Sequence, residues 1–437
     1  MKNLLASSIA LTTLTTMAQA NVFLPNIGID GWNTDGILAQ GAALNQGYLT
    51  LAHDQNHFIN PAYSLDLQDS AQANLGGSNS GGVWTEVFGQ KMGLYLGRQN
   101  GDSALDNGGN LYALDTTGNG NLNNTSDVSQ PDSLFDLYWA NRMDAGDLGL
   151  RLNVRAHGES GEEEINDDDL EETSTTSFYQ VFLSAGFISQ NMPMEATAHL
   201  GLPFGGQTVK SVDDNAGTET IDEFSSDSGL RWGATAKYTL SETQTSRTLI
   251  SGFVGGVAAS YNQTTEDVVN DNQTFDSVYI QTHLALGVVG SYERMINNRT
   301  RLVTSAGLTR ISRKIGRENQ LEGFEQEDFV ETAQYSLPIA VGIEFASSER
   351  TEWSASVSDY LFTRESTTTY DWNGTDEKVE ETETEATNWG SPNPNVQIGV
   401  NRELVERLHG HFVLNTNLVG ANFFPSIATQ ATLTYEF

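Results

Sequence analysis

The segment "DLGLRLNVRAH", residues 147–157, alternates between apolar and polar side chains. In a strand, one face would carry Leu148, Leu150, Leu152, Val154 and Ala156, and the other Gly149, Arg151, Asn153, Arg155 and His157. The pattern returns in "LRWGATAKYTL" (230–240), "VYIQTHLALGVVGSY" (278–292) and "HFVLNTNL" (411–418). Strands of about ten residues with one apolar face predict an all-β, transmembrane antiparallel β-barrel that is apolar outside.

The connections between these strands alternate in length, which is typical of an outer-membrane barrel. Short connections are expected at 143–146, 189–192, 296–299, 347–350 and near 403–407. Long polar loops are expected at 99–132, 158–174, 205–227, 262–273, 315–328, 365–392 and 419–427. Seven long loops predict fourteen strands, the first near 88–98 and the last near 428–437. A hairpin turning near Gly89 and Gln90, with an earlier strand near 66–76, would make sixteen.

Both ends of the chain agree with an exported barrel. Residues 1–20, "MKNLLASSIALTTLTTMAQA", combine Lys2, an apolar stretch and an Ala-Gln-Ala end, which predicts a secretory signal peptide rather than a buried helix. The last ten residues, "ATQATLTYEF", alternate again and end on Phe437. We expect this strand to close the barrel against the first one. Its terminal aromatic resembles the signature that the barrel-assembly machinery recognises.

Composition narrows the possible classes of protein. The chain has no cysteine, and no apolar stretch of about 20 residues follows the signal peptide, so disulfides and transmembrane helices are not expected. A secreted or periplasmic soluble protein and a barrel in the outer membrane of a Gram-negative bacterium remain. The alternating strands favour the barrel.

Residues 21–80 are apolar and glycine-rich without clean alternation, and we expect them to form a plug or hatch in the lumen of a barrel made by 81–437. Within this segment, "LAHDQNHFINPAYSL" (51–65) resembles the N-terminal signature of the FadL-type transporters of long-chain fatty acids and other hydrophobic compounds. The matching hatch positions are Gly47, Ala52, Asp54, Asn60, Pro61 and Ala62, whereas Tyr63 stands where many relatives have glycine.

This resemblance implies a fourteen-stranded barrel with an N-terminal hatch, and uptake of a hydrophobic small molecule. An ordinary turn before a strand would explain Asn60-Pro61-Ala62 equally well. Apolar side chains of the same segment are candidates for ligand contact, although simple packing of the plug is favoured; they are Phe23, Leu24, Ile27, Ile29, Trp32, Ile37 and Phe58.

The chain is strongly acidic, with 57 Asp and Glu against 22 Lys and Arg. Runs such as "GESGEEEINDDDLEE" (158–172) fall in the expected external loops and are typical of a solvated, self-repelling surface. No cofactor is expected, but Ca²⁺ or Mg²⁺ could bridge these carboxylates to lipopolysaccharide. Asp115, Asn119 and Asp127 faintly follow the spacing of a calcium loop, although a surface turn is favoured.

Basic residues fall at positions expected to face the lumen, where a porin field and a bracing network of paired charges are both possible. They are Arg151, Arg155, Arg231, Lys237, Arg310 and Arg313, and the bracing network is favoured. The sequence has no G-x-S-x-G or H-E-x-x-H motif, and we expect no enzyme. The formal charge of −35 disfavours nucleic-acid binding.

Three functions follow in order of preference. The first is passive uptake of a hydrophobic compound through a plugged barrel, and the second is a cation-preferring diffusion porin. The third is a structural surface barrel whose acidic loops bind divalent cations. The expected partners are outer-membrane lipid and lipopolysaccharide, the hydrophobic molecule and the assembly machinery.

Overall fold

The computed structural model describes residues 60–75, 80–97, 113–115, 125–127, 132–165, 170–213, 218–267, 273–321, 324–348, 350–371, 380–389, 395–417 and 428–437. The expected signal peptide and the plug segment up to residue 59 lie outside these ranges. A short 3-10 helix, η2 (Pro61–Asp66), precedes the strands. The strands are β1 (Ser70–Leu75), β2 (Ser80–Val87), β3 (Gln90–Leu96), β4 (Ala113–Asp115), β5 (Thr125–Asp127), β6 (Asp132–Met143), β7 (Gly146–Ile165), β8 (Leu170–Ser189), β9 (Met194–Asp213), β10 (Thr218–Glu242), β11 (Ser246–Asp267), β12 (Gln273–Asn297), β13 (Thr300–Leu321), β14 (Phe324–Ser348), β15 (Thr351–Asp371), β16 (Glu380–Trp389), β17 (Asn395–Val405), β18 (Leu408–Asn417) and β19 (Ala428–Glu436).

The large sheet closes into an antiparallel barrel, because β1 pairs with both β2 and β19. The last strand therefore closes against the first strand of the barrel, as predicted, although that strand is β1 and not the expected strand near 88–98. β16 pairs with the upper part of β15 and β17 with its lower part, so these two strands share one position in the wall. The 17 strands of this sheet thus make sixteen wall positions in the described part of the chain, while β4 and β5 form a separate hairpin.

The expected count of fourteen strands was wrong, and so was the count that the family resemblance implied. The additional strands are β1 and β2. β2 and β3 form the hairpin that the alternative count required, turning at Phe88 (φ 54°) and Gly89 (φ 78°). Only residues 76–79 separate β1 from β2, at the end of the barrel where the other connections are long. A rule that recognises strand pairs by their long loops therefore misses this pair.

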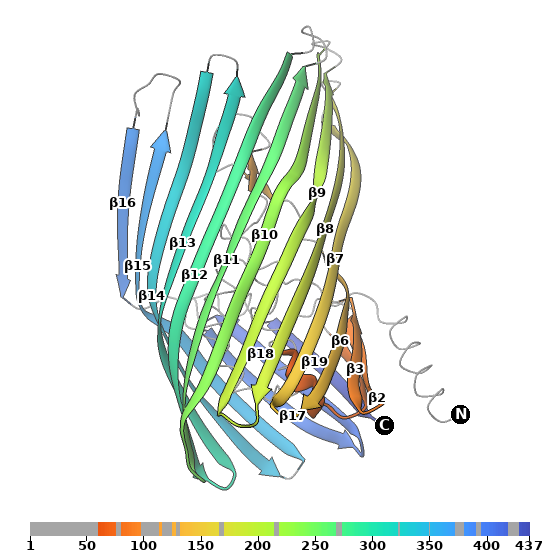
Figure 1. Ribbon diagram of the computed structural model, residues 1–437, viewed down its shortest axis with the longest axis vertical. Coiled ribbons are helices and arrows are strands. Elements are labelled where there is room, and N and C mark those ends of the chain that lie inside the picture. Colours follow the sequence, from red (N-terminus) through yellow and green to blue (C-terminus); the bar gives the residue numbers. More distant parts are fainter. Residues whose placement is uncertain are drawn as a thin grey trace, which may run out of the picture.

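The two ends of the barrel differ in the length of the connections between strands. The short connections, predicted near 143–146, 189–192, 296–299, 347–350 and 403–407, lie at one end, here called the short-turn end. At the other end the expected loops 158–174, 205–227, 262–273 and 315–328 proved to be mostly strand, because β7 to β15 continue as hairpins. The ladder of backbone hydrogen bonds needs no apolar face, so it continues where the alternation stops. In Figure 1 these strands rise above the short β17, β18, β19, β2, β3 and β6.

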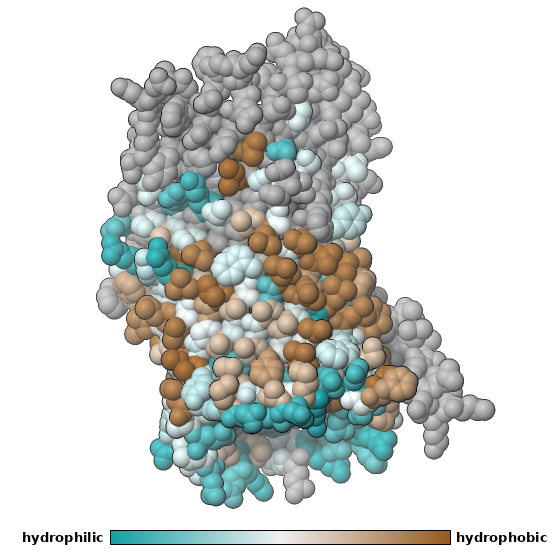
Figure 2. All heavy atoms as spheres, viewed as in Figure 1, coloured by the Kyte–Doolittle hydropathy of each residue, from teal (hydrophilic) through white to brown (hydrophobic). Residues whose placement is uncertain are grey.

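The outer face carries a band of exposed apolar side chains, drawn brown around the middle of Figure 2 above a teal rim. β14 shows the limits of the band. From Phe345 to Tyr335, alternate residues point outward: Phe345, Ile343, Val341 and Tyr335 are 40 to 51% exposed, and the apolar residues at 337 and 339 are partly exposed. This length matches the roughly ten residues that a tilted strand needs to cross the hydrocarbon of a bilayer. An exposed apolar belt of this height between aromatic borders is the surface that a membrane covers.

Among the described residues, no helix is long and apolar enough to cross a membrane.

Candidate functional site: the inner wall at the short-turn end

The first described residues of the chain lie against the inside of the barrel. η2 contacts β3, β6, β7 and β8, and two glycines of that wall, Gly149 and Gly186, are cross-strand partners. A Cβ at Gly186 would overlap Asn60 Oδ1, and a Cβ at Gly149 would overlap the main chain of Pro61 and Ala62. This glycine pair, called the glycine seat below, therefore provides the space into which the turn fits.

Local hydrogen bonds make the turn rigid. Asn60 caps η2 in an extended conformation, its Oδ1 accepting a hydrogen bond from Ala62 N at 3.1 Å, and Pro61 follows at the first helical position. Ser64 Oγ donates to Pro61 O at 2.7 Å. Asn60, Ala62 and Ser64 are all buried. The Asn-Pro-Ala segment is thus a turn before a strand, and that turn is held on the inner wall.

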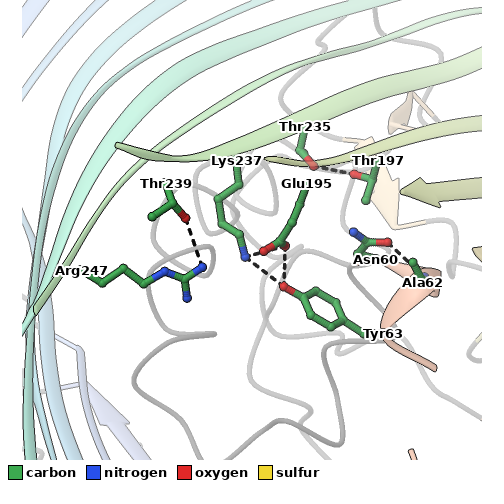
Figure 3. Close-up of polar contacts among 9 residues, drawn as sticks. All are labelled: Asn60, Ala62, Tyr63, Glu195, Thr197, Thr235, Lys237, Thr239 and Arg247. Carbon is green, nitrogen blue, oxygen red and sulfur yellow. Dashed lines mark hydrogen bonds and ion pairs between the residues drawn. The ribbon is translucent and has the colours of Figure 1, made fainter. Parts of the chain in front are cut away.

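Tyr63 joins this turn to β9 and β10, as Figure 3 shows. Its hydroxyl donates to Glu195 Oε2 and accepts a hydrogen bond from Lys237 Nζ at 3.0 Å. Lys237 and Glu195 are cross-strand partners whose charged groups lie 2.5 Å apart, and Lys237 Nζ is also 5.6 Å from the centre of the Tyr63 ring. These three side chains, called the luminal latch below, hold η2 through two charge-assisted hydrogen bonds in a partly buried site.

A second ion pair lies in the wall beside the seat. Arg151 and Asp136 form a salt bridge of 2.7 Å, and their side chains are 2% and 0% exposed. The Arg151 guanidinium also lies 5.8 Å from the centre of the Tyr138 ring, which packs near Trp84, and Trp84 packs near Tyr95. Charges and aromatic rings therefore brace β2, β3, β6 and β7 from the inside.

A third group of charges on the inner wall surrounds Arg301. Arg301 Nε donates to Glu344 Oε2 at 2.7 Å, and Arg301 Nη1 lies 3.7 Å from Glu293 Oε2. Arg247 donates to Thr239 Oγ1 at 3.2 Å. Arg151, Lys237 and Arg301 are therefore each beside a carboxylate, which reduces the field of one sign that they would otherwise produce in the lumen.

Large apolar side chains occupy other inward positions. Phe182 on β8, Phe253 on β11 and Val289 on β12 are buried, and the residues next to them along each strand are more exposed and point outward, so these three side chains face the lumen. Glycines make room for two of the rings, since a Cβ at Gly201 would overlap Phe182 and one at Gly287 would overlap Phe253. The lumen is consequently lined in part by hydrocarbon, unlike the polar interior of an open porin.

The closing seam of the barrel meets the site at Asp69, which lies between η2 and β1. Lys91 Nζ donates to Asp69 Oδ1 at 2.8 Å, Glu86 N donates to the same oxygen at 2.9 Å, and Phe437 N donates to Asp69 O at 3.0 Å. Burial raises the pKa of Asp69, but the hydrogen bond and the charge of Lys91 outweigh this effect and hold the pKa below its ordinary value. The final residue is therefore fixed beside the N-terminal turn.

The structure shows which of the expected lumen charges face inward. Arg151 and Lys237 face inward, and each is paired with a carboxylate. Arg155 and Arg231 lie within β7 and β10, and their side chains, like that of Arg313, are outside those described. Arg310 was placed in the lumen wrongly: it shares the parity of the exposed Leu308 and lies on the outer face. Polar character alone misled the assignment, because outward positions above the bilayer are polar too.

Several predicted residues lie outside the described ranges: Gly47, Ala52, Asp54, Phe23, Leu24, Ile27, Ile29, Trp32, Ile37, Phe58 and Asn119. Asp115 ends β4 and Asp127 ends β5, and the register Ala113 to Asp127 places these two aspartates at opposite ends of a short ladder. Within the described residues, no group of three or more His, Cys, Asp or Glu is placed to hold a metal ion.

Sequence reasoning missed Glu195 and the glycine seat. Glu195 opens the alternating run "MEATAHLGL" (194–202), and that alternation would have placed it on the polar face opposite Leu200. Gly149 and Gly186 carry no comparable signal, because small residues are common on an inward face and only the docked turn distinguishes them.

Comparison with known proteins adds a likeness to solved barrels. No family model and no curated protein sequence matches the chain. The toluene transporter TodX from Pseudomonas putida is 11% identical, with 87% of this chain and 91% of TodX covered and a TM-score of 0.35. The toluene transporter TbuX from Ralstonia pickettii is 10% identical, with 87% and 92% covered and a TM-score of 0.35.

These are transporters of the group that the Asn60-Pro61-Ala62 segment resembles. The outer membrane protease OmpT from Escherichia coli is also similar, at 9% identity, 66% and 96% coverage and a TM-score of 0.24. All of these identities and TM-scores are low.

Proposed function

We propose that this chain is an outer-membrane transporter that admits a hydrophobic small molecule passively through the barrel. The observation that carries the proposal is the inward row of large apolar side chains, represented by Phe182, Phe253 and Val289. A ligand pocket for an apolar molecule needs a mostly apolar lining with a few polar groups that fix orientation. Both kinds of group occur on the inner wall of this barrel.

The seated turn supplies the closing element of the proposal. Asn60-Pro61-Ala62 enters the glycine seat and Tyr63 enters the luminal latch, so the chain N-terminal to η2 is anchored inside the barrel at the short-turn end. A segment held there by a few contacts can be displaced without opening the wall. The plug was predicted to end at residue 80, but β1 and the start of β2 belong to the wall, so only the part of the predicted plug that precedes η2 would be carried by this anchor.

Uptake of labelled toluene by cells with an intact lipopolysaccharide layer tests the proposal. Cells that make the protein should accumulate toluene faster than cells that lack it, with or without a proton gradient. Phe253→Asn should slow uptake several-fold because it places an amide in the apolar row, whereas Phe253→Leu should retain most of it. Equal uptake by Phe253→Asn and the parent protein would show that the apolar row does not line the transport path.

A cation-preferring porin is the second candidate, favoured by the acidic tips of the tall strands, where residues 158–172 contain no basic residue. Planar-bilayer conductance separates the two candidates. The transporter predicts that the mature protein stays closed and that deletion of residues 21–64 opens it. Steady, cation-selective conductance of the intact protein would favour the porin instead.

A further inference from the structure

The outer face of β13, β14 and β15 carries a row of basic and aromatic side chains at the upper border of the apolar belt. Arg310 is the cross-strand partner of Tyr335, and Tyr335 is the partner of Arg364. Partners across neighbouring strands point to the same face, and Tyr335 is exposed on the outer one. The two arginines therefore stand on alternate strands about 10 Å apart, on either side of one tyrosine.

The residues below and above this row on β13 and β14 show where the row lies relative to the apolar belt. On β14 the outward residues between Phe345 and Tyr335 are apolar, and on β13 Leu308, one outward position below Arg310, is 61% exposed. Just above the row, Lys314 on β13 faces Glu331 on β14, 3.3 Å away, with both side chains more than 40% exposed. The outer face changes from hydrocarbon to charge at Arg310. This is the level at which the phosphate groups of a membrane lie.

The two arginines of the row have different partners. Arg364 is paired with Glu385 at 2.7 Å, and both side chains are 52% exposed. Arg310 lies 5.4 Å from the centre of the Tyr335 ring, and no carboxylate among the described residues pairs with it. An arginine stacked on an aromatic ring keeps its hydrogen-bond donors directed to the side, ready for a bidentate oxyanion.

We propose that this row binds a phosphate group of lipopolysaccharide in the outer leaflet, with Arg310 as its anchor. Arg364 and Lys314, each already beside a carboxylate, supply further hydrogen-bond donors near it, and the Tyr335 ring lies at the boundary between acyl chains and head groups. The charge complementarity stands out because the chain as a whole has a formal charge of −35. The proposal rests on the outer-membrane location proposed above, but not on transport.

Lipid A binding to the purified full-length mature protein in detergent tests the site, with native mass spectrometry as the measurement. Diphosphorylated lipid A should bind the parent protein at least about tenfold more tightly than the double variant Arg310→Ala/Arg364→Ala, since a lost hydrogen bond between charged groups has about that effect. Arg310→Lys keeps the charge without the fork and should bind with intermediate affinity.

Arg294→Ala provides the matched control. Arg294 is also exposed on the outer face, on neighbouring β12, but near the short-turn end, and its removal should leave lipid A binding unchanged. Dephosphorylated lipid A should not distinguish the parent protein from the double variant. Toluene uptake should be the same in all variants, so a failure of this proposal can be told from a failure of transport.

Three results would overturn the proposal. The first is equal binding of diphosphorylated lipid A by the parent protein and the double variant. The second is an equal loss with Arg294→Ala. The third is binding of phosphatidylglycerol that is as tight as that of lipid A and equally sensitive to Arg310, which would indicate a general contact with anionic lipid.

Discussion

Substitution of Gly149 by alanine probes the glycine seat directly. The added Cβ would overlap the main chain of Pro61 and Ala62, which cannot rotate away as the end of a flexible side chain could. Asn60 holds that main chain through its cap, so the turn as a whole must shift. Overpacking of a well-packed site typically costs about 1 to 3 kcal/mol. The ratio of unseated to seated turn should therefore rise by about 5- to 150-fold.

The direction of the effect separates this reasoning from an ordinary strand substitution. In a strand without a docked turn, replacing glycine by alanine is neutral or stabilises by about 0.5 to 1 kcal/mol. Gly290→Ala is the matched control, because its Cβ would meet nothing closer than Ala306 O at 3.9 Å. The control should therefore behave like the parent protein.

Single-channel recording in a planar bilayer measures the seated fraction. The parent protein and Gly290→Ala should remain closed for most of the record, while Gly149→Ala should open more often by the factor given above. Limited proteolysis should cut Gly149→Ala faster near residue 60, since an unseated turn is accessible. A Gly149→Ala protein that stays closed, resists protease and unfolds at the same or a higher temperature would refute the seat.

Three further predictions follow from the polar contacts. Tyr63→Phe removes the hydroxyl of the luminal latch and should lower the free energy of unfolding by about 1.5 to 3 kcal/mol, measured by thermal unfolding. An unchanged unfolding temperature would contradict the latch. Arg151→Ala leaves Asp136 as an uncompensated buried charge and should lower the free energy of unfolding by about 3 to 5 kcal/mol. The folded barrel should then shift to its unfolded position on a gel at a lower temperature. An unchanged shift temperature would contradict the buried pair. The pKa of Asp69 in the folded protein is lowered because of Lys91. Its contribution to the stability of the fold is therefore present above about pH 4 and is lost as the pH falls through that lowered pKa. Acid unfolding of Asp69→Asn should lack this loss, and parallel unfolding curves for the variant and the parent protein would refute the prediction.

Much of the barrel could be predicted because a bilayer imposes a simple pattern. Alternation in "DLGLRLNVRAH" identified β7, and outward Leu150 is exposed as predicted. The turns at 144–145 and 298–299 followed from the breaks in that pattern. Strand extent above the belt could not be predicted, because β7 and β8 continue through residues that alternate no longer. Their hydrogen bonds are made by the backbone, which every residue other than proline supplies.

The site was less predictable than the wall. Asn60-Pro61-Ala62 was singled out by its resemblance, and a turn before a strand was the alternative interpretation of the same residues. Its docking place was not found, because Gly149 and Gly186 are 37 residues apart in the chain and only strand register makes them partners. The partnership of Tyr63 with β9 and β10 has the same origin.

The sequence by itself determined that this chain is an all-β barrel with an apolar exterior. It also determined which face of each alternating strand meets the membrane. Both features depend on the periodicity of side chains within one strand. Only the tertiary structure decided the count of sixteen, the height of the tall strands and the meeting of η2 with the glycine seat and the luminal latch. Those features depend on register between strands, and register is a relation between segments that local pattern does not record.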